Sequence, residues 1–226
     1  ATDVTSAIGD GAARCIAIKS GTYCRIEGFV LEHGASPSSG EDKHTCYGGA
    51  VYGVGVTKPE TVFVVDCEMR NCAAGWGMVI GATCIRSLVT NCYSPTGNNL
   101  SSLLRNTKLY ACVVAHNACY DVFAASTYAI NTTFADNSTG RRFCRSGCWI
   151  YNCVVLSSGA VDSNLELNDH GVTTGYQVMG TATDDWRLIA GCEAATAGTQ
   201  GLALITARET AFLAKALGRS ALAGKA

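Results

Sequence analysis

The feature that most constrains this chain is a short pattern that returns about every 20 residues. Five segments carry it, and in each one small and apolar residues alternate with other residues. They are VVDCEMRNC (64–72), CIRSLVTNC (84–92), LYACVVAHN (109–117), AINTTFADN (129–137) and IYNCVVLSS (150–158). Alternation with a period of two predicts strands. A nearly fixed interval predicts repeats that bury their faces only against neighbouring repeats.

Three columns of residues line up when the segments are aligned. The middle column contains the small residues, at intervals of 20, 25, 20 and 21 positions, and each segment ends on a polar pair that suits a turn. A unit of this length has no room for a crossover helix, so we expect each strand to lie directly above the previous one, as in a parallel β-helix. We expect all three columns to face the interior. They are Val65, Ile85, Tyr110, Ile130 and Tyr151; Cys67, Ser87, Cys112, Thr132 and Cys153; and Met69, Val89, Val114, Phe134 and Val155.

The predicted fold class is therefore all-β, a parallel β-helix over residues 1–180. Residues 181–226 depart from the pattern, and we expect them to form a closing segment with a short helix. Thr206 is its predicted N-cap and Glu209 the capping-box partner. The segment would cover either the open end of the coil, where strand edges are unpaired, or a neutral face. Its apolar side is Phe212, Leu213 and Leu217.

Charge and hydropathy exclude some partners. The 17 Lys and Arg residues balance 18 Asp and Glu residues, so the sequence shows no basic footprint for nucleic acid. No run approaches the roughly 18 apolar residues that span a bilayer, so we expect no membrane insertion by this segment. The first residues contain neither a basic region nor an apolar one, and any export signal is expected to have been removed or to lie upstream.

The cysteines follow the repeat rather than a metal-binding spacing. Their number is 13, which is odd, and no C-x-x-C occurs. Most are expected to be small buried residues, and no metal or cofactor is predicted, because structural zinc sites usually show closely paired ligands. Cys144 and Cys148 form one candidate disulfide if the protein is exported.

Two short motifs and a C-terminal stretch add a resemblance. Gly48-Gly49-Ala50-Val51 matches a "GGA plus aliphatic" motif, and Phe134-Ala135-Asp136-Asn137 matches "FxxN". The stretch DWRLIAGCEAATAGT (185–199) looks like a closing segment, with Cys192-Glu193-Ala194 in place of Ser-Pro-Ala. In these residues the chain resembles bacterial surface and secreted β-helix proteins of the pectate-lyase-like superfamily, including the polymorphic outer-membrane protein repeats of autotransporter-like adhesins. The resemblance implies a right-handed coil that is secreted or displayed at the cell surface.

No catalytic constellation is visible. The pectin hydrolases of this superfamily carry "NTD", a pair of aspartates, "GHG" and "RIK", and none of these occurs here. Asp66 and Glu68 are the only acidic residues at the aligned outward positions, and Arg86 is expected to pair with Asp66 from one rung above. His116 and Asp136 share a column on neighbouring rungs and are the one candidate base and partner. No catalytic residue is predicted.

Aromatic residues provide the candidate ligand site. Trp76, Tyr47 and Tyr52 lie near the polar loop 35–46, and loops on such scaffolds often carry function. These rings either stack on sugars or pack over the rung below. We expect an exported or cell-surface domain that binds or displays, with a polysaccharide or host-surface glycan as ligand. The alternatives are a polysaccharide lyase or glycoside hydrolase, and a structural spacer of a larger surface protein.

Overall fold

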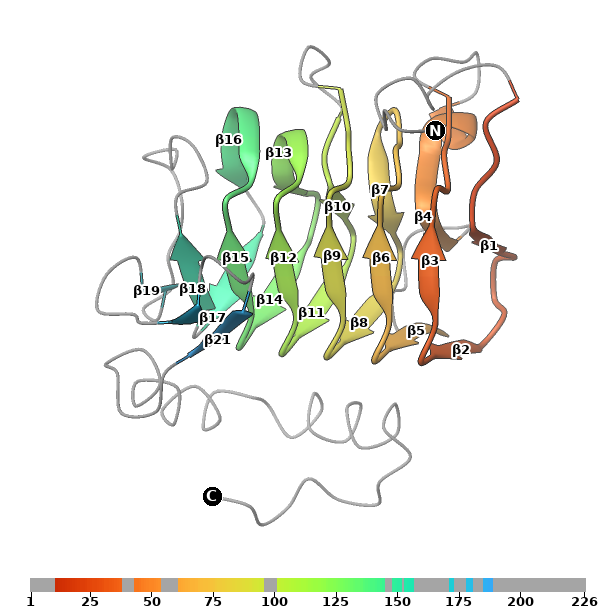
Figure 1. Cartoon of the computed structure of the whole chain (residues 1–226). Coiled ribbons are helices and arrows are strands. Elements are labelled where there is room, and N and C mark those ends of the chain that lie inside the picture. The colour runs from red at the N-terminus through yellow and green to blue at the C-terminus, as the bar shows by residue number, and fades with distance from the viewer. Residues whose placement is uncertain are drawn as a thin grey trace.

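The computed structural model describes residues 11–37, 43–53, 61–95, 101–144, 148–151, 153–156, 171–172, 178–180 and 185–188. In these residues strands dominate, and they form three parallel sheets that wrap into one coil (Figure 1). Every third strand along the chain belongs to the same sheet until the last turns. One turn of the coil, called a rung below, therefore contributes one strand to each sheet.

The strands of the three sheets, called A, B and C, are as follows. Sheet A contains β1 (Ile16–Ile18), β4 (Tyr47–Gly53), β7 (Gly77–Ile80), β10 (Leu104–Arg105), β13 (Ala118–Ala124) and β16 (Ser138–Cys144). Sheet B contains β2 (Cys24–Glu27), β5 (Val62–Val65), β8 (Thr83–Ile85), β11 (Lys108–Tyr110), β14 (Tyr128–Ile130) and β17 (Trp149–Tyr151). Sheet C contains β3 (Val30–Glu32), β6 (Glu68–Arg70), β9 (Leu88–Thr90), β12 (Val113–Ala115), β15 (Thr133–Ala135), β18 (Cys153–Leu156) and β19 (Gly171–Val172).

Two smaller elements complete the described structure. A 3-10 helix, η2 (Lys43–Cys46), precedes β4. An antiparallel pair, β20 (Val178–Gly180) and β21 (Asp185–Leu188), lies at the C-terminal end. Apart from Asp185–Leu188, the predicted closing segment 181–226 lies outside the described residues. Within the part that is described, no helix is long and apolar enough to cross a membrane.

The register confirms the predicted stacking. Val65 pairs with Ile85, Ile85 with Tyr110, and Tyr110 with Ile130, so like side chains lie above one another on successive rungs. The second column is buried, and the third belongs to the interior core. The all-β fold class and the parallel β-helix are confirmed.

The first predicted column is wrong in its direction. In β5 the interior core contains Val62 and Val64, so strand alternation places Val65 on the opposite face of sheet B. The reason is Asp66, whose φ of +49° makes a corner between β5 and β6 and interrupts the period of two. The same correction applies to Ile85, Tyr110 and Ile130, while the side chain of Tyr151 lies outside the described set.

Left-handed residues make these corners. Between sheets B and C the residues other than glycine are Asp66, Arg86, Ala111 and Asn131, with φ from +48° to +53°. Between sheets C and A they include Asn71, Asn91, His116 and Asp136, with φ from +47° to +56°. Asn and Asp tolerate this conformation better than most residues, which explains the recurring polar pair. Its first member turns the chain, and its second member points inward.

Small hydrogen-bonding side chains fill the corner between sheets B and C. The Cys67 thiol donates to the Val65 carbonyl at 3.2 Å, and the Ser87 hydroxyl donates to the Ile85 carbonyl at 3.0 Å. Thr132 repeats this bond to the carbonyl two residues before it, at 3.1 Å. A side chain that donates to the carbonyl two residues before it has to be short, which explains why Cys, Ser and Thr occupy this corner. The predicted corner of small residues is confirmed. Cys67, Cys84 and Cys112 are free thiols, as are Cys72 and Cys92.

The corner between sheets C and A contains a second ladder, of Cys and Asn. The Cys72 and Cys92 thiols each donate to the carbonyl two residues earlier, at 3.3 Å in both cases. Asn117 makes the same bond through Nδ2, at 2.9 Å, and its Nδ2 also donates to Asn137 Oδ1 at 2.9 Å. Cysteine and asparagine are therefore interchangeable here as donors toward the backbone.

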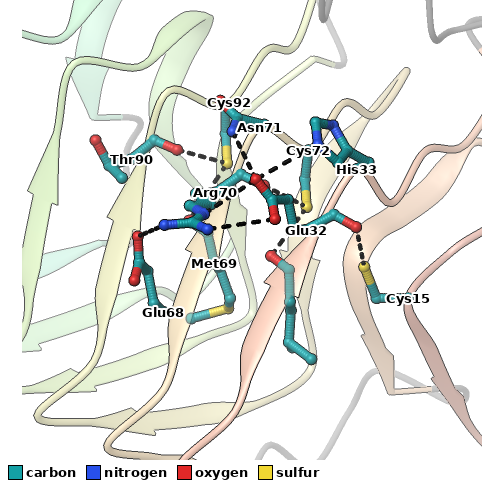
Figure 2. Close-up of polar contacts among 11 residues, drawn as sticks. Cys15, Glu32, His33, Glu68, Met69, Arg70, Asn71, Cys72, Thr90 and Cys92 are labelled. Carbon is teal, nitrogen blue, oxygen red and sulfur yellow. Dashed lines mark hydrogen bonds and ion pairs between the residues drawn. The ribbon is translucent and has the colours of Figure 1, made fainter. Parts of the chain in front are cut away.

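Cys15 completes this ladder on the first rung (Figure 2). The ladder position there is Gly34, because Ala35 pairs with Ala73 and Gly34 therefore aligns with Cys72. A Cβ on Gly34 would lie 2.4 Å from the Cys15 Sγ, so the thiol occupies the space of the missing side chain. The Cys15 thiol also donates to the Glu32 carbonyl at 3.5 Å. This is the hydrogen bond to the carbonyl two residues earlier that a ladder side chain at position 34 would make.

The pKa values of these thiols favour their role as donors. The hydrogen bond with Cys72, followed by burial, raises the pKa of Cys15 far above its usual range. For Cys72, the hydrogen bond from Cys15 lowers the pKa, but the hydrogen bond with Cys92 and burial raise it more, to about 12. Burial raises the pKa of Cys112 to about 11. All three thiols therefore keep their protons at neutral pH.

Candidate functional site

The structure brings the three predicted ligand residues together on the outer face of sheet A. The ring centroids of Tyr47 and Tyr52 are 5.9 Å apart, as are those of Tyr47 and Trp76. Tyr52 pairs in register with Ile80, and these two side chains point away from the core, which contains the preceding residues Val51 and Val79. Tyr47, Tyr52 and Trp76, called the aromatic cluster below, pack on Ile80.

The three rings differ in accessibility. Tyr47 is 6% exposed and Tyr52 is 4% exposed, whereas Trp76 is only partly buried. Trp76 is therefore the member that offers surface to a ligand. Its Nε1 atom is buried and has no hydrogen-bond partner among the described residues, although a buried indole N–H usually has one.

Two arginines that the sequence did not reveal as site residues flank the aromatic cluster. The guanidinium carbon of Arg14 is 5.1 Å from the Tyr52 ring centroid, and that of Arg105 is 6.0 Å from the Tyr47 ring centroid. Arg14 Nε donates to the Tyr47 carbonyl at 2.6 Å, and Arg14 Nη2 donates to the Thr45 carbonyl at 2.7 Å. Arg14 thus fixes the start of β4.

Arg105 forms no ion pair with a described carboxylate. Arg105 pairs in register with Ile80, and Ile80 pairs with Tyr52 on its other side. Arg105 therefore lies in the same row as Tyr52, two rungs further along the coil. This register is the signal that could have placed Arg105 at the cluster, but it depends on aligning rungs across the loop at 96–100. The site therefore combines a partly exposed indole with a partly exposed guanidinium.

A polar group on the outer face of sheet C was also missed by the sequence analysis (Figure 2). Arg70 lies between two carboxylates: its Nε donates to Glu32 at 3.1 Å and its Nη1 donates to Glu68 at 3.1 Å. Asn71 Nδ2 adds a third donor to Glu32 at 3.1 Å. The pKa of Glu32 is lowered, first by the hydrogen bond from Arg70 and then by that from Asn71. A carboxyl of lowered pKa stays ionised near neutral pH and is a poor general acid.

Glu32 gives a pH prediction. Because the pKa of Glu32 is lowered by folding, its contribution to stability is present above the ordinary carboxyl pKa of about 4.3 and is lost as the pH falls through the folded value. We expect Glu32→Gln to lower Tm at pH 7 by at most about 2 °C, since the pair is solvent-exposed. This Tm difference should shrink toward pH 3. Thermal denaturation from pH 7 to pH 3 measures it, and Glu32→Gln should have a smaller effect in an Arg70→Gln background, where the Asn71 and His33 contacts of Glu32 remain.

The predicted ion pair between Asp66 and Arg86 is confirmed. Arg86 Nε donates to Asp66 Oδ1 at 2.7 Å, and Arg86 Nη2 donates to Asp66 Oδ2. The interaction joins two left-handed corner residues on neighbouring rungs. Both side chains are substantially exposed, so this pair is a surface contact rather than a buried charge network.

The other sequence-derived candidates have these outcomes. His116 and Asp136 occupy equivalent corner positions on neighbouring rungs, and their role as base and partner stays a prediction. The side chain of Cys144 lies outside the described set, so the disulfide with Cys148 also stays a prediction. In the residues that the structure describes, no group of three or more His, Cys, Asp or Glu side chains is arranged to hold a metal ion.

No protein-family model, curated protein or solved structure matches this chain.

Proposed function

We propose that this coil is the ligand-binding part of an exported or surface-displayed protein, and that it binds glycans at the aromatic cluster. The observation that carries the proposal is the convergence of Trp76, Tyr47 and Tyr52 on one face, with Arg105 beside them. The resemblance to surface β-helix adhesins supports the same class of function.

The cluster has the chemistry of a small sugar site. An indole face binds the apolar face of a pyranose, and a planar guanidinium donates several hydrogen bonds to hydroxyl or carboxylate oxygens. The buried tyrosines hold the indole in place from below, so the surface that meets the ligand is small and the affinity of one site is expected to be modest.

The test is retention of the protein on immobilised or gel-embedded polysaccharides, both acidic and neutral. Trp76→Ala is expected to weaken binding at least about tenfold, which corresponds to about 1.4 kcal/mol. Tyr23→Ala is the matched control, because Tyr23 is an exposed aromatic outside the cluster, at 52% exposure. Equal retention of the wild type and Trp76→Ala would exclude the aromatic cluster as the binding site. Release of shortened chains from any polysaccharide would overturn the proposed binding function in favour of a polysaccharide-degrading enzyme.

A further inference from the structure

The outer face of sheet B points away from the core and is nevertheless buried. Val65 is 0% exposed, Ile85 is 2% exposed and Tyr110 is 5% exposed. Strand pairing places these residues side by side on successive rungs. Over β5, β8, β11 and β14 the face consists of Phe63, Val65, Thr83, Ile85, Lys108, Tyr110, Tyr128 and Ile130, and on β2 the polar residues Arg25 and Glu27 continue it.

Contacts with the neighbouring rungs of the coil do not by themselves account for this burial. On the outer face of sheet C, Val30 of the first rung is 52% exposed, and Leu88, Val113 and Thr133 of the later rungs are partly exposed, although the smaller Ala115 and Ala135 are buried. Both faces are built mainly from strands of three or four residues in the same coil. The difference means that another part of the chain covers the outer face of sheet B.

The size of the face limits what covers it. Its four strands, β5, β8, β11 and β14, are spaced by roughly 4.8 Å, so the face is about 14 Å long across the rungs. A helix of about 12 residues is roughly 18 Å long, and its apolar stripe would match one such row. Where it meets Val65, Ile85 and Ile130, such a cover must also be apolar, because these side chains present only hydrocarbon.

We propose that the C-terminal segment, residues 189–226, docks on the outer face of sheet B through the apolar side of residues 206–217. This segment begins after β21 and has 38 residues, the longest stretch outside the described ranges. Leu213 and Leu217 are four positions apart, and Phe212 adjoins Leu213, so helical spacing would put all three on one side. The inference is independent of the proposed glycan site, which lies on sheet A.

Photo-crosslinking of the full chain tests this docking. Tyr128→benzoylphenylalanine places the probe at a partly exposed position of the face with little change in shape. Mass spectrometry is expected to find crosslinked peptides from residues 206–217. The same probe at Thr133, on the outer face of sheet C, should not reach them. Crosslinks from Tyr128 to a second copy, to another part of the chain, or to nothing would each overturn the proposal.

A pair of charge substitutions gives an independent readout. Leu213→Asp would put a carboxylate into the docked side and release the segment, so binding of an environment-sensitive apolar dye should rise several-fold over the wild type. Lys215→Asp changes the opposite side of the same predicted helix, and its dye binding should equal that of the wild type. Equal dye binding by both variants would contradict the proposal.

Discussion

Asn117→Ala is expected to lower the free energy of unfolding by about 4 kcal/mol, because several buried polar groups lose their partner together. Asn117 is 1% exposed in the corner between sheets C and A. Its Nδ2 donates to the carbonyls of Val89 and Ala115 at 3.0 and 2.9 Å. Its Oδ1 accepts from the Cys92 amide at 2.9 Å. Urea denaturation, with the slope compared between variants, measures the change.

The matched variant is Asn117→Cys, which places at this position the residue that occupies the ladder at 72 and 92. A thiol keeps a donor toward the Ala115 carbonyl but accepts hydrogen bonds poorly. We therefore expect about half of the loss seen with alanine. If Asn117→Ala unfolded at the wild-type urea concentration, the hydrogen-bonded ladder would not stabilise this corner.

Phe134→Ala is expected to cost about 3–5 kcal/mol, the range for removal of a fully buried phenylalanine. Phe134 belongs to the third column and is 0% exposed. Its ring centroid lies 4.9 Å from that of Phe123 and 5.0 Å from that of Phe143, both in edge-on geometry. Removing it would leave a cavity between sheets C and A that the fixed rungs cannot close.

Phe29→Ala is the control for this prediction. Phe29 aligns with Cys67 on the next rung but is 61% exposed, because the narrow corner that fits Cys, Ser or Thr has no room for a ring. Its replacement should change stability by no more than about 0.5 kcal/mol. Similar losses for Phe134→Ala and Phe29→Ala would mean that the core is not where the register places it.

The sequence was sufficient to predict the coil because each rung repeats the same local requirements. A small donor is needed at the corner after sheet B, and a residue that tolerates positive φ is needed before the ladder of Cys and Asn. The first requirement recurs at 67, 87, 112 and 132 and the second at 71, 91, 116 and 136, so the repeat is visible without any knowledge of the structure. The direction of the first column was not predictable in the same way, since a single left-handed residue reverses the parity of alternation.

The surroundings of the candidate site were harder to predict than its aromatic residues. Tyr47, Tyr52 and Trp76 are within 30 positions of one another in the sequence, so their proximity could be expected. Arg14 and Arg105 come from rungs on either side, and Glu32 meets Arg70 across 38 positions. Such contacts depend on the register across irregular loops, and a repeat pattern does not fix how many residues a loop adds.

Hydrogen-bond scalar couplings measured by NMR test the central claim, the parallel stacking of rungs, most directly. The amide of Leu88 should couple to the carbonyl of Cys67, that of Val113 to Ser87, and that of Thr133 to Cys112, since these pairs are 2.9 to 3.0 Å apart. Each coupling would join residues more than 20 positions apart in the same direction along the chain. Couplings of these amides to carbonyls four residues earlier, or to an antiparallel neighbour, would contradict the parallel coil.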